Sequence, residues 1–380
     1  MSAAPSNAVE ARGEGSDNLA ALVVTTSTSP PPPSVPISVA PAPPQPDTGV
    51  ATVPPGGAPL SKAAGAPPFL TAHEGLIFAV SRIEGEWMEV LTGCDTRAWI
   101  PRDAVIFEPT SNRAEAGPGF DLTTAVAVID PGHGGPNIGA TGPTGLIENE
   151  ANLAIARRTL TLLRTSHTVD WETGLVLPGE EIPALGQVLL TRTEGPPGAD
   201  IEAGLLFRAT LATAAGADAV VSIHNNAAPE GPIAGPGSEV FYSVVSDESR
   251  RLAGILYEEF LLSFSRFDID WVGNSDRGAR YRLSRDGFID YYGILRRAGA
   301  PTALAEGLFI SNPAEEALLR SRSGQQAYAE AVYRAIIRFL TTDDQGSGWS
   351  DPIPVTAPIA GTGDAREDCV VPPQPGTELR

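Results

Sequence analysis

The sequence predicts an α/β protein whose main domain is a mixed, largely parallel sheet flanked by helices, over residues 122–340. Two observations support this fold class. Short apolar runs alternate with segments whose apolar residues recur at helical spacing, which is typical of strand–helix–strand units. Chemically reactive polar residues also follow several apolar runs directly, at the positions where open α/β sheets place their sites.

The elements of this domain are predicted from the apolar pattern in chain order. Strands are expected over residues 125–129, 188–191, 219–223, 237–242 and 302–305. The first helix is expected after Glu148, because the residues from Leu153 to Leu163 place an apolar stripe on one side. Further helices are expected over residues 205–215, around residues 252–260 and around residues 331–339.

Proline and glycine are spread unevenly along the chain, which has 36 prolines and 40 glycines, and proline is concentrated towards the two ends. The stretch PPPPSVPISVAPAPPQPDTGVATVPPGGAP lies within the first 67 residues. Proline removes backbone donors, and the shortage of large apolar side chains leaves little to offset the entropy of ordering. We therefore expect residues 1–67 to be a disordered linker and residues 342–380 a disordered tail, with the main domain over residues 122–341.

Charge and hydropathy argue against two classes of partner. The formal net charge is −20 and no basic stretch stands out to neutralise phosphates, so a nucleic-acid partner is not expected. No run approaches the roughly 18 apolar residues of a membrane span, so no transmembrane segment is expected. Residues 18–24 are too short for the apolar part of an export signal. Cys94 and Cys369 lie far apart and form no CxxC pattern, so their pairing stays open.

Residues 69–109 have the texture of a small β module, with strand-like runs at residues 76–81, 87–91 and 98–100. The spacing of Gly85, Trp87 and Trp99 resembles bacterial SH3-like domains, so we expect a small all-β SH3-like barrel over residues 68–110. The two tryptophans are either core residues or a stacking surface for sugar or peptide. We favour the core, because small barrels bury their few aromatic side chains.

The stretch VAVIDPGHGGPNIGATGPTGLIENE, residues 126–150, joins the first strand to the first helix. The strand breaks at an Asp-Pro-Gly turn, so His133 follows at the edge of the sheet, and a glycine-rich loop leads to Glu148. An imidazole at a strand end and a carboxylate at a helix start can supply two ligands to one zinc ion. His224 and Glu306 also follow apolar strands. Together these residues favour a metal site over unrelated polar positions.

Five motifs occur in order along the main domain: DPGHGG, GLIENEANL, VLLTR, SIHNNA and AEGLFISNP. Together they resemble the zinc-dependent N-acetylmuramoyl-L-alanine amidases of the amidase 3 family of cell-wall hydrolases. The resemblance spans nearly all of residues 122–340. It implies one zinc ion held by His133, Glu148 and His224, with Glu306 as the catalytic carboxylate. Two further family positions fall on Asn226 and Arg277, for which we expect a supporting or substrate-positioning role.

Amide hydrolysis needs a nucleophilic water, a polarised carbonyl and a proton for the departing amine, and no Ser or Cys triad is evident in the sequence. A zinc ion with three protein ligands keeps a fourth position for water, whose pKa it lowers to about 7. Glu306 can then take the proton and hand it to the leaving nitrogen. Asp130 either orients the imidazole of His133 or only forms the turn, and both roles stay open.

The resemblance implies hydrolysis of the bond between N-acetylmuramic acid and L-alanine of peptidoglycan stem peptides, in cell-wall remodelling or daughter-cell separation. Peptidoglycan is then the partner, and an extracytoplasmic location in the cell wall or periplasm follows from the substrate, although the sequence shows no clear signal peptide. Two alternatives remain: a non-catalytic peptidoglycan-binding or regulatory protein, and a zinc peptidase acting on the stem peptide. The sequence does not identify an activating partner.

Two segments depart from the family pattern. Residues 167–186 are inserted after the first helix and predict either a hairpin beside the cleft or a neutral surface insertion, of which we favour the second. Residues 271–299 form a long segment with several arginines and the adjacent Tyr291 and Tyr292. These arginines either bind carboxylates of the stem peptide or are solvated surface charge, which is the default interpretation.

Overall fold

The structure is a computed structural model, and it describes residues 48–92, 96–111, 113, 115–135, 137–193, 204–228, 237–269, 277–283 and 290–353. By spatial contact the chain divides into two compact units, Met1–Pro44 and Gln45–Arg380. All described residues belong to the second unit. Cys94 and Cys369 lie outside the described residues, as do residues 1–47 of the predicted linker.

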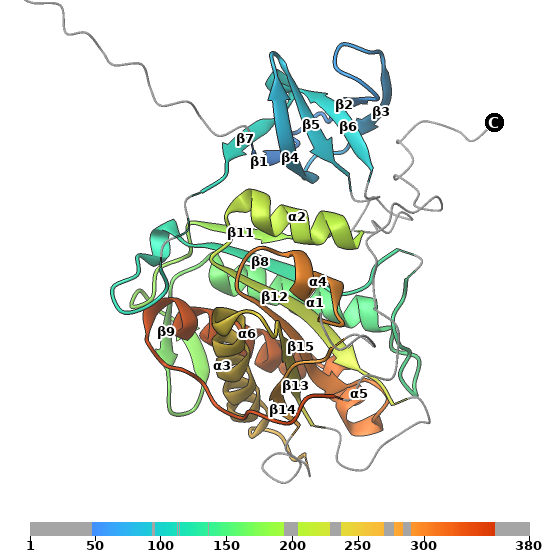
Figure 1. Cartoon of the computed structure of the whole chain (residues 1–380). Coiled ribbons are helices and arrows are strands. Elements are labelled where there is room, and N and C mark those ends of the chain that lie inside the picture. The colour runs from blue at the N-terminus through green and yellow to red at the C-terminus, as the bar shows by residue number, and fades with distance from the viewer. Residues whose placement is uncertain are drawn as a thin grey trace, which may run out of the picture. The chain divides into compact units, whose positions relative to one another are not determined.

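An antiparallel sheet of seven strands forms the first part of this second unit (Figure 1). Its order is β3-β2-β6-β5-β4-β1-β7. The strands are β1 (Gly49–Thr52), β2 (Ala58–Ser61), β3 (Pro68–Ala72), β4 (Ile77–Glu84), β5 (Trp87–Leu91), β6 (Arg97–Pro101) and β7 (Ile106–Pro109). Alternate residues of β4 and β5, including Phe78, Val80, Met88 and Val90, point into a core that belongs to this module.

The predicted start of this module is wrong, because β1 and β2 lie within the residues expected to be linker. β1 pairs with β4 and with β7, and β2 pairs with β3 and β6. Most of these partners lie well along the chain, so the proline-rich local composition gives no sign of them. The module therefore begins at Gly49 rather than at residue 68.

The core placement of the two tryptophans is also wrong. Trp87 and Trp99 are both half-buried, and neither belongs to the buried cluster of the module. Aliphatic side chains, together with Phe78 and Met88, fill the interior instead. The guanidinium of Arg82 covers the Trp99 ring, 5.0 Å from its centroid.

The second sheet has six strands in the order β11-β8-β12-β15-β13-β14. They are β8 (Val126–Pro131), β11 (Gln187–Leu190), β12 (Ala219–Asn226), β13 (Glu239–Tyr242), β14 (Gly278–Arg280) and β15 (Thr302–Phe309). All neighbours are parallel except β13 and β15, which run antiparallel. The structure thus confirms the prediction of a mixed, largely parallel sheet.

Helices cover both faces of this sheet (Figure 1). One face carries α1 (Glu148–Leu163), α3 (Asp247–Phe264), α5 (Pro313–Arg320) and α6 (Arg322–Thr341), and the other carries α2 (Leu205–Ala215) and α4 (Gly293–Arg297). All six residues of β8 are buried, as expected for a parallel strand covered on both sides. The second face of α2 shares a buried cluster with Val50, Ala79 and Leu91 of the seven-stranded sheet.

The inserted residues 167–186 contain a hairpin of β9 (His167–Asp170) and β10 (Leu175–Pro178). It lies away from Glu148, which agrees with the favoured interpretation of a surface insertion rather than a hairpin beside the cleft. The helix α1 begins at Glu148 and ends at Leu163, so the hairpin follows the far end of a helix about 24 Å long. There the hairpin contacts α6, since Arg334 of α6 donates a hydrogen bond to the main-chain oxygen of Gly174.

The first residues of the predicted disordered tail are ordered in the structure. The main-chain oxygen of Gly348 accepts a hydrogen bond of 2.7 Å from Ala279 of β14, and Ser350 donates one of 3.0 Å to Ala279. The guanidinium of Arg250 stacks over the ring of Trp349 at 3.9 Å. Residues 342–353 are held against the domain by these contacts and by Arg251 and Arg338, which bind Thr342 and Asp344, despite the polar composition of the segment.

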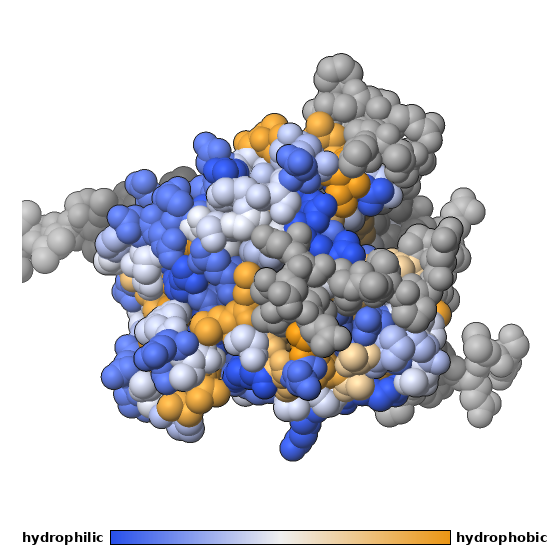
Figure 2. Space-filling model, turned by 90° about the horizontal axis from the view of Figure 1, so that it is seen from below, coloured by the Kyte–Doolittle hydropathy of each residue, from blue (hydrophilic) through white to orange (hydrophobic). Residues whose placement is uncertain are grey.

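In the part of the chain that the structure describes, no helix is long and apolar enough to cross a membrane. The face shown in Figure 2 is covered mainly by hydrophilic residues, with hydrophobic residues in smaller, separate groups.

Candidate metal and catalytic site

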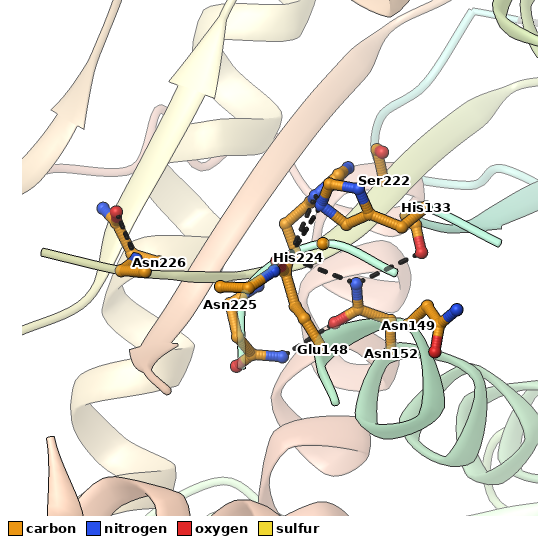
Figure 3. Close-up of polar contacts among 12 residues, drawn as sticks. His133, Glu148, Asn149, Asn152, Ser222, His224, Asn225 and Asn226 are labelled. Carbon is orange, nitrogen blue, oxygen red and sulfur yellow. Dashed lines mark hydrogen bonds and ion pairs between the residues drawn. The ribbon is translucent and has the colours of Figure 1, made fainter. Parts of the chain in front are cut away.

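His133, Glu148 and His224 meet at one edge of the six-stranded sheet (Figure 3). Nε2 of His133 lies 3.1 Å from Oε1 of Glu148, and Nδ1 of His224 lies 3.3 Å from the same oxygen. The two ring nitrogens are 3.2 Å apart. Among the described residues, this is the one group of three or more His, Cys, Asp or Glu side chains whose ligand atoms could share a metal ion.

The three donor atoms fit one zinc ion. The ring Nδ1 of His133 lies 2.9 Å from Oδ1 of Asn137. An amide oxygen only accepts, so the ring proton sits on Nδ1 and Nε2 keeps its lone pair for a metal. Zinc with bonds of about 2.0–2.1 Å in a tetrahedron separates its ligand atoms by about 3.3 Å. The observed spacings of 3.1–3.3 Å match this value.

The carboxylate of Glu148 is held by the first turn of α1 and by two main-chain amides. Ala140 donates to Oε2 at 2.9 Å, and Asn225 donates to Oε1 at 3.1 Å. Asn152, one helical turn after Glu148, donates to Oε1 at 3.4 Å and accepts a hydrogen bond of 2.8 Å from the side chain of Asn225. Each oxygen of the ligand is therefore oriented before any metal binds.

The charges of the site depend on one another. Burial raises the pKa of Glu148, but hydrogen bonds and charge from His133 and His224 outweigh burial and hold that pKa far below its usual range. Burial lowers the pKa of His224, which favours the neutral ring that binds metals. Burial also lowers the pKa of His133, but the hydrogen bond and charge of Glu148 raise it overall.

Main-chain geometry explains the glycine-rich loop. His133 has φ of 60°, and it is the one non-glycine residue with positive φ in the described part of the chain. A Cβ on Gly132 would lie 2.3 Å from the ring of His224, and a Cβ on Gly139 would lie 2.5 Å from the Glu148 carboxylate. Glycine at these two positions therefore lets the loop pass close to His224 and Glu148.

Two buried arginines hold the carbonyl groups of the turn that carries His133. Arg192 donates hydrogen bonds of 3.0 Å to the main-chain oxygens of Pro131 and Gly132. Arg208, from α2, donates to the oxygens of Pro131 at 2.7 Å and His133 at 2.5 Å. Three successive carbonyl groups therefore point at guanidinium groups. These contacts fix the main chain of His133 in its left-handed conformation.

Asp130 does not orient the imidazole of His133, so that expectation is wrong: the ring is held by Asn137 instead. The Asp130 carboxylate accepts hydrogen bonds of 2.5 Å from Thr191, Arg208 and Ser222. Burial raises the pKa of Asp130, but the charge of Arg208 and these hydrogen bonds lower it to about 2. Asp130 is linked to the site through Arg208, which also donates to the main-chain oxygen of His133, and its charge acts on His224.

Glu306 lies beside His224, because β12 and β15 are parallel neighbours in which these two residues are paired. Both strands continue past the predicted ends, so His224 and Glu306 lie within strands rather than after them. The β12–β15 register shifts between His224 and Asn226, and such bulges often occur next to active sites. Burial, and then the negative charges of Glu148 and Glu239, raise the pKa of Glu306 well above its usual value.

Glu239 connects the remaining predicted site residues. It lies opposite Glu306 in the antiparallel pair of β13 and β15 and is 3% exposed. Its carboxylate accepts a hydrogen bond of 2.8 Å from Asn226, and Arg277 and Arg280 approach it at 3.4 Å and 3.1 Å. Asn226 and Arg277 are thus brought together on one carboxylate. Figure 3 shows Asn226 apart from the three ligand residues.

Sequence interpretation missed several residues that shape the site: Asn137, Asn152, Arg192, Arg208, Asn225 and Glu239. Two of them had a usable signal. Asn152 stands four residues after Glu148 in a helix, so it shares a face with the ligand. Glu239 is a lone charge in the apolar run SEVFY, which indicates a buried carboxylate that needs partners. The arginines and Asn137 depend on tertiary contacts that no local pattern reveals.

A largely parallel sheet that gathers imidazole and carboxylate groups at one edge defines a class of protein. It is an α/β enzyme whose site is suited to hydrolysis and in which three side chains can hold a metal ion. A sequence profile of the N-acetylmuramoyl-L-alanine amidase family matches residues 127–338. The chain belongs to that family, which confirms the resemblance drawn from the five motifs.

Individual relatives agree with this family. An N-acetylmuramoyl-L-alanine amidase of Mycobacterium tuberculosis is 32% identical over 244 residues, which cover 62% of this chain and 95% of that protein. An amidase of Neisseria meningitidis is 26% identical over 266 residues, which cover 60% of this chain and 56% of that protein. The solved amidase of Clostridium difficile 630 is 27% identical. The match covers 58% of this chain and 99% of the solved chain, with a TM-score of 0.45.

Proposed function

We propose that this N-acetylmuramoyl-L-alanine amidase uses one zinc ion, held by His133, Glu148 and His224, to hydrolyse peptidoglycan. The bond cut joins the lactyl group of N-acetylmuramic acid to L-alanine of the stem peptide. Family membership supports the reaction. The single observation that carries the zinc proposal is the mutual spacing of three donor atoms, which lie 3.1–3.3 Å from one another.

The bound zinc would supply Lewis-acid chemistry, polarising the amide carbonyl and favouring a nucleophilic water near neutral pH. The chain supplies the proton transfers. We assign Glu306 as the group that takes a proton from the attacking water and gives it to the leaving nitrogen of L-alanine. Its position beside His224 supports this role. Burial and the negative charges of Glu148 and Glu239 raise the pKa of Glu306, which favours uptake of a proton by this carboxylate.

We propose a positioning role for Asn226 and Arg277. Both side chains bind Glu239, the neighbour of Glu306 across the sheet. Arg277 also stacks over the ring of Phe309 at 4.4 Å, which restricts its guanidinium further. These contacts give the strand-end side of the site a fixed set of hydrogen-bonding groups, which supports a role in orienting the peptide next to Glu306.

We also propose that the seven-stranded module is an SH3-like domain that binds the cell wall. Its two tryptophans are half-buried, so the stacking role now has more support than the core role. Because peptidoglycan lies outside the cytoplasmic membrane, we place the action of the chain in the cell wall or periplasm. Binding of Trp99→Ala to purified sacculi, compared with the unaltered chain, tests the module without depending on hydrolysis.

The two alternatives differ in what they require. A non-catalytic binding protein has no need for Glu306 beside the three donor residues, whereas this chain keeps all four together. A zinc peptidase acting within the stem peptide would give truncated peptides. Zinc titration separates the first alternative: chelator-treated protein should recover hydrolysis of sacculi with one equivalent of zinc per chain. Zinc bound at one equivalent without any hydrolysis would instead support the binding protein.

A further inference from the structure

Three arginines in and around β14 have different partners: Arg277 precedes the strand, Arg280 ends it, and Arg282 lies two residues past its end. Arg277 and Arg280 both approach the Glu239 carboxylate. The guanidinium carbon of Arg282 instead lies 3.9 Å from the centroid of the Tyr291 ring and 6.0 Å from that of Tyr292. Among the described residues, no carboxylate lies within ion-pair distance of Arg282.

A half-buried guanidinium with no carboxylate partner among the described residues is costly in a chain with a formal net charge of −20. Stacking on an aromatic ring offsets part of the loss of water and holds the planar group in one orientation. The result is a guanidinium with a fixed plane and with hydrogen-bond donors to offer. Such a group is suited to a bidentate contact with a carboxylate.

Arg282 is connected to the reaction centre through Tyr292. The ring of Tyr292 packs on Phe241 of β13 at 4.9 Å, and its hydroxyl shares a hydrogen bond with Arg282. Phe241 is two residues from Glu239, so both side chains lie on the face of the sheet that carries Glu306. Burial, followed by the charge of nearby Glu306, raises the pKa of Tyr292. Arg282 therefore lies on the same face as Glu306, beyond Glu239 and Tyr292.

The chemistry of the substrate decides whether the sugar side or the peptide side of the cleaved bond can bind this guanidinium. The lactyl carboxyl of the sugar is consumed in the bond to L-alanine, so the sugar side of that bond brings no charge. The peptide side carries carboxylates at its end and on acidic side chains. Resting on the proposed function, we propose that Arg282, held by Tyr291 and Tyr292, binds a carboxylate of the stem peptide and makes the chain prefer peptidoglycan with free peptide carboxylates.

The experiment compares purified sacculi whose peptide carboxylates are free with the same sacculi after chemical conversion of carboxylates to carboxamides. Initial rates are measured against sacculus concentration for the unaltered chain, Arg282→Gln, Arg282→Lys and the control Arg297→Gln. Arg297 is an exposed arginine of the same segment. A charge-assisted contact of about 1.5–3 kcal/mol corresponds to a preference of about 10-fold or more for free carboxylates.

We expect the unaltered chain and Arg297→Gln to show this preference, mainly through KM. Arg282→Gln should hydrolyse both substrates at the rate that the unaltered chain shows on the carboxamide form. Arg282→Lys should keep part of the preference for free carboxylates, because it retains the charge but not the planar guanidinium. If the unaltered chain and Arg282→Gln prefer free carboxylates over carboxamides to the same degree, the role of Arg282 is overturned. The proposed amidase function is not affected by that result. Absence of hydrolysis of untreated sacculi by the unaltered chain would overturn the proposed function and this proposal with it.

Discussion

Glu306 of β15 lies beside His224 of β12, paired with it across two neighbouring parallel strands. The carboxylate therefore sits next to a proposed metal ligand without being one of the three converging donors. We expect Glu306→Gln, which keeps the size of the side chain but cannot take up a proton, to lower kcat on sacculi by about 10²–10⁴-fold. Zinc content, measured by atomic emission, should stay at one per chain. Loss of zinc would show that Glu306 supports the ligands instead.

Gly132 gives the ring of His224 its space. We expect Gly132→Ala to weaken zinc binding, because its Cβ would lie 2.3 Å from the His224 ring and would displace this ligand. Gly145→Ala is the matched control. Its φ is +85°, so it also strains the backbone, but no atom lies within 4 Å of the added Cβ. Competition for zinc with a chelator of known affinity measures both variants. Equal zinc affinity in the two would contradict the packing argument.

Arg208 links α2 to the main-chain oxygen of His133. Arg208→Lys cannot donate to Asp130, Pro131 and His133 together, so we expect the zinc affinity to fall about 10–100-fold, as for other groups that orient ligands. The spectrum of the cobalt-substituted protein should change as well, because it reports ligand geometry.

Arg334→Lys provides the control for this variant. Arg334 is as deeply buried, but it pairs with Glu259 between α3 and α6. We expect it to lower the free energy of unfolding and to leave the cobalt spectrum unchanged. If both variants lose stability and neither changes the spectrum or the zinc affinity, Arg208 is a structural residue only.

Asp130 gives the stability of the domain a dependence on acid pH. Its pKa falls from 3.8 to about 2 on folding, so it stabilises the fold above its unfolded pKa, and this contribution is lost as the pH falls through about 2. The shift corresponds to about 2 kcal/mol. In urea unfolding of metal-free protein, the difference between the unaltered chain and Asp130→Asn should shrink by about that amount from pH 5 to pH 2. A difference independent of pH would refute the shift.

Much of the main domain could be predicted because its strands are continuous apolar runs. Such runs appear only where both faces of a parallel sheet are covered. The three residues of the candidate metal site could be brought into one prediction because His133 and His224 follow or end these runs, and Glu148 begins a helix with a clear apolar stripe. Where the signal is a local pattern, the sequence interpretation agrees with the structure.

The rest depends on contacts between distant segments. β1 pairs with β4 and β7, so its order arises from partners that the local composition does not show. Asn137, rather than Asp130, reaches the His133 ring because the turn directs the Asp130 side chain towards Arg208. The tail is ordered by Trp349 against Arg250. None of these relationships follows from spacing along the chain.

The most direct test of the central claim is mass spectrometry of the soluble products released from purified sacculi by the zinc-loaded chain. The proposed activity predicts intact stem peptides with a free L-alanine amino group, and glycan left with free lactyl carboxyls. Their release should stop with a chelator and return with zinc. Peptides cut internally, with L-alanine still attached to the sugar, would contradict the account.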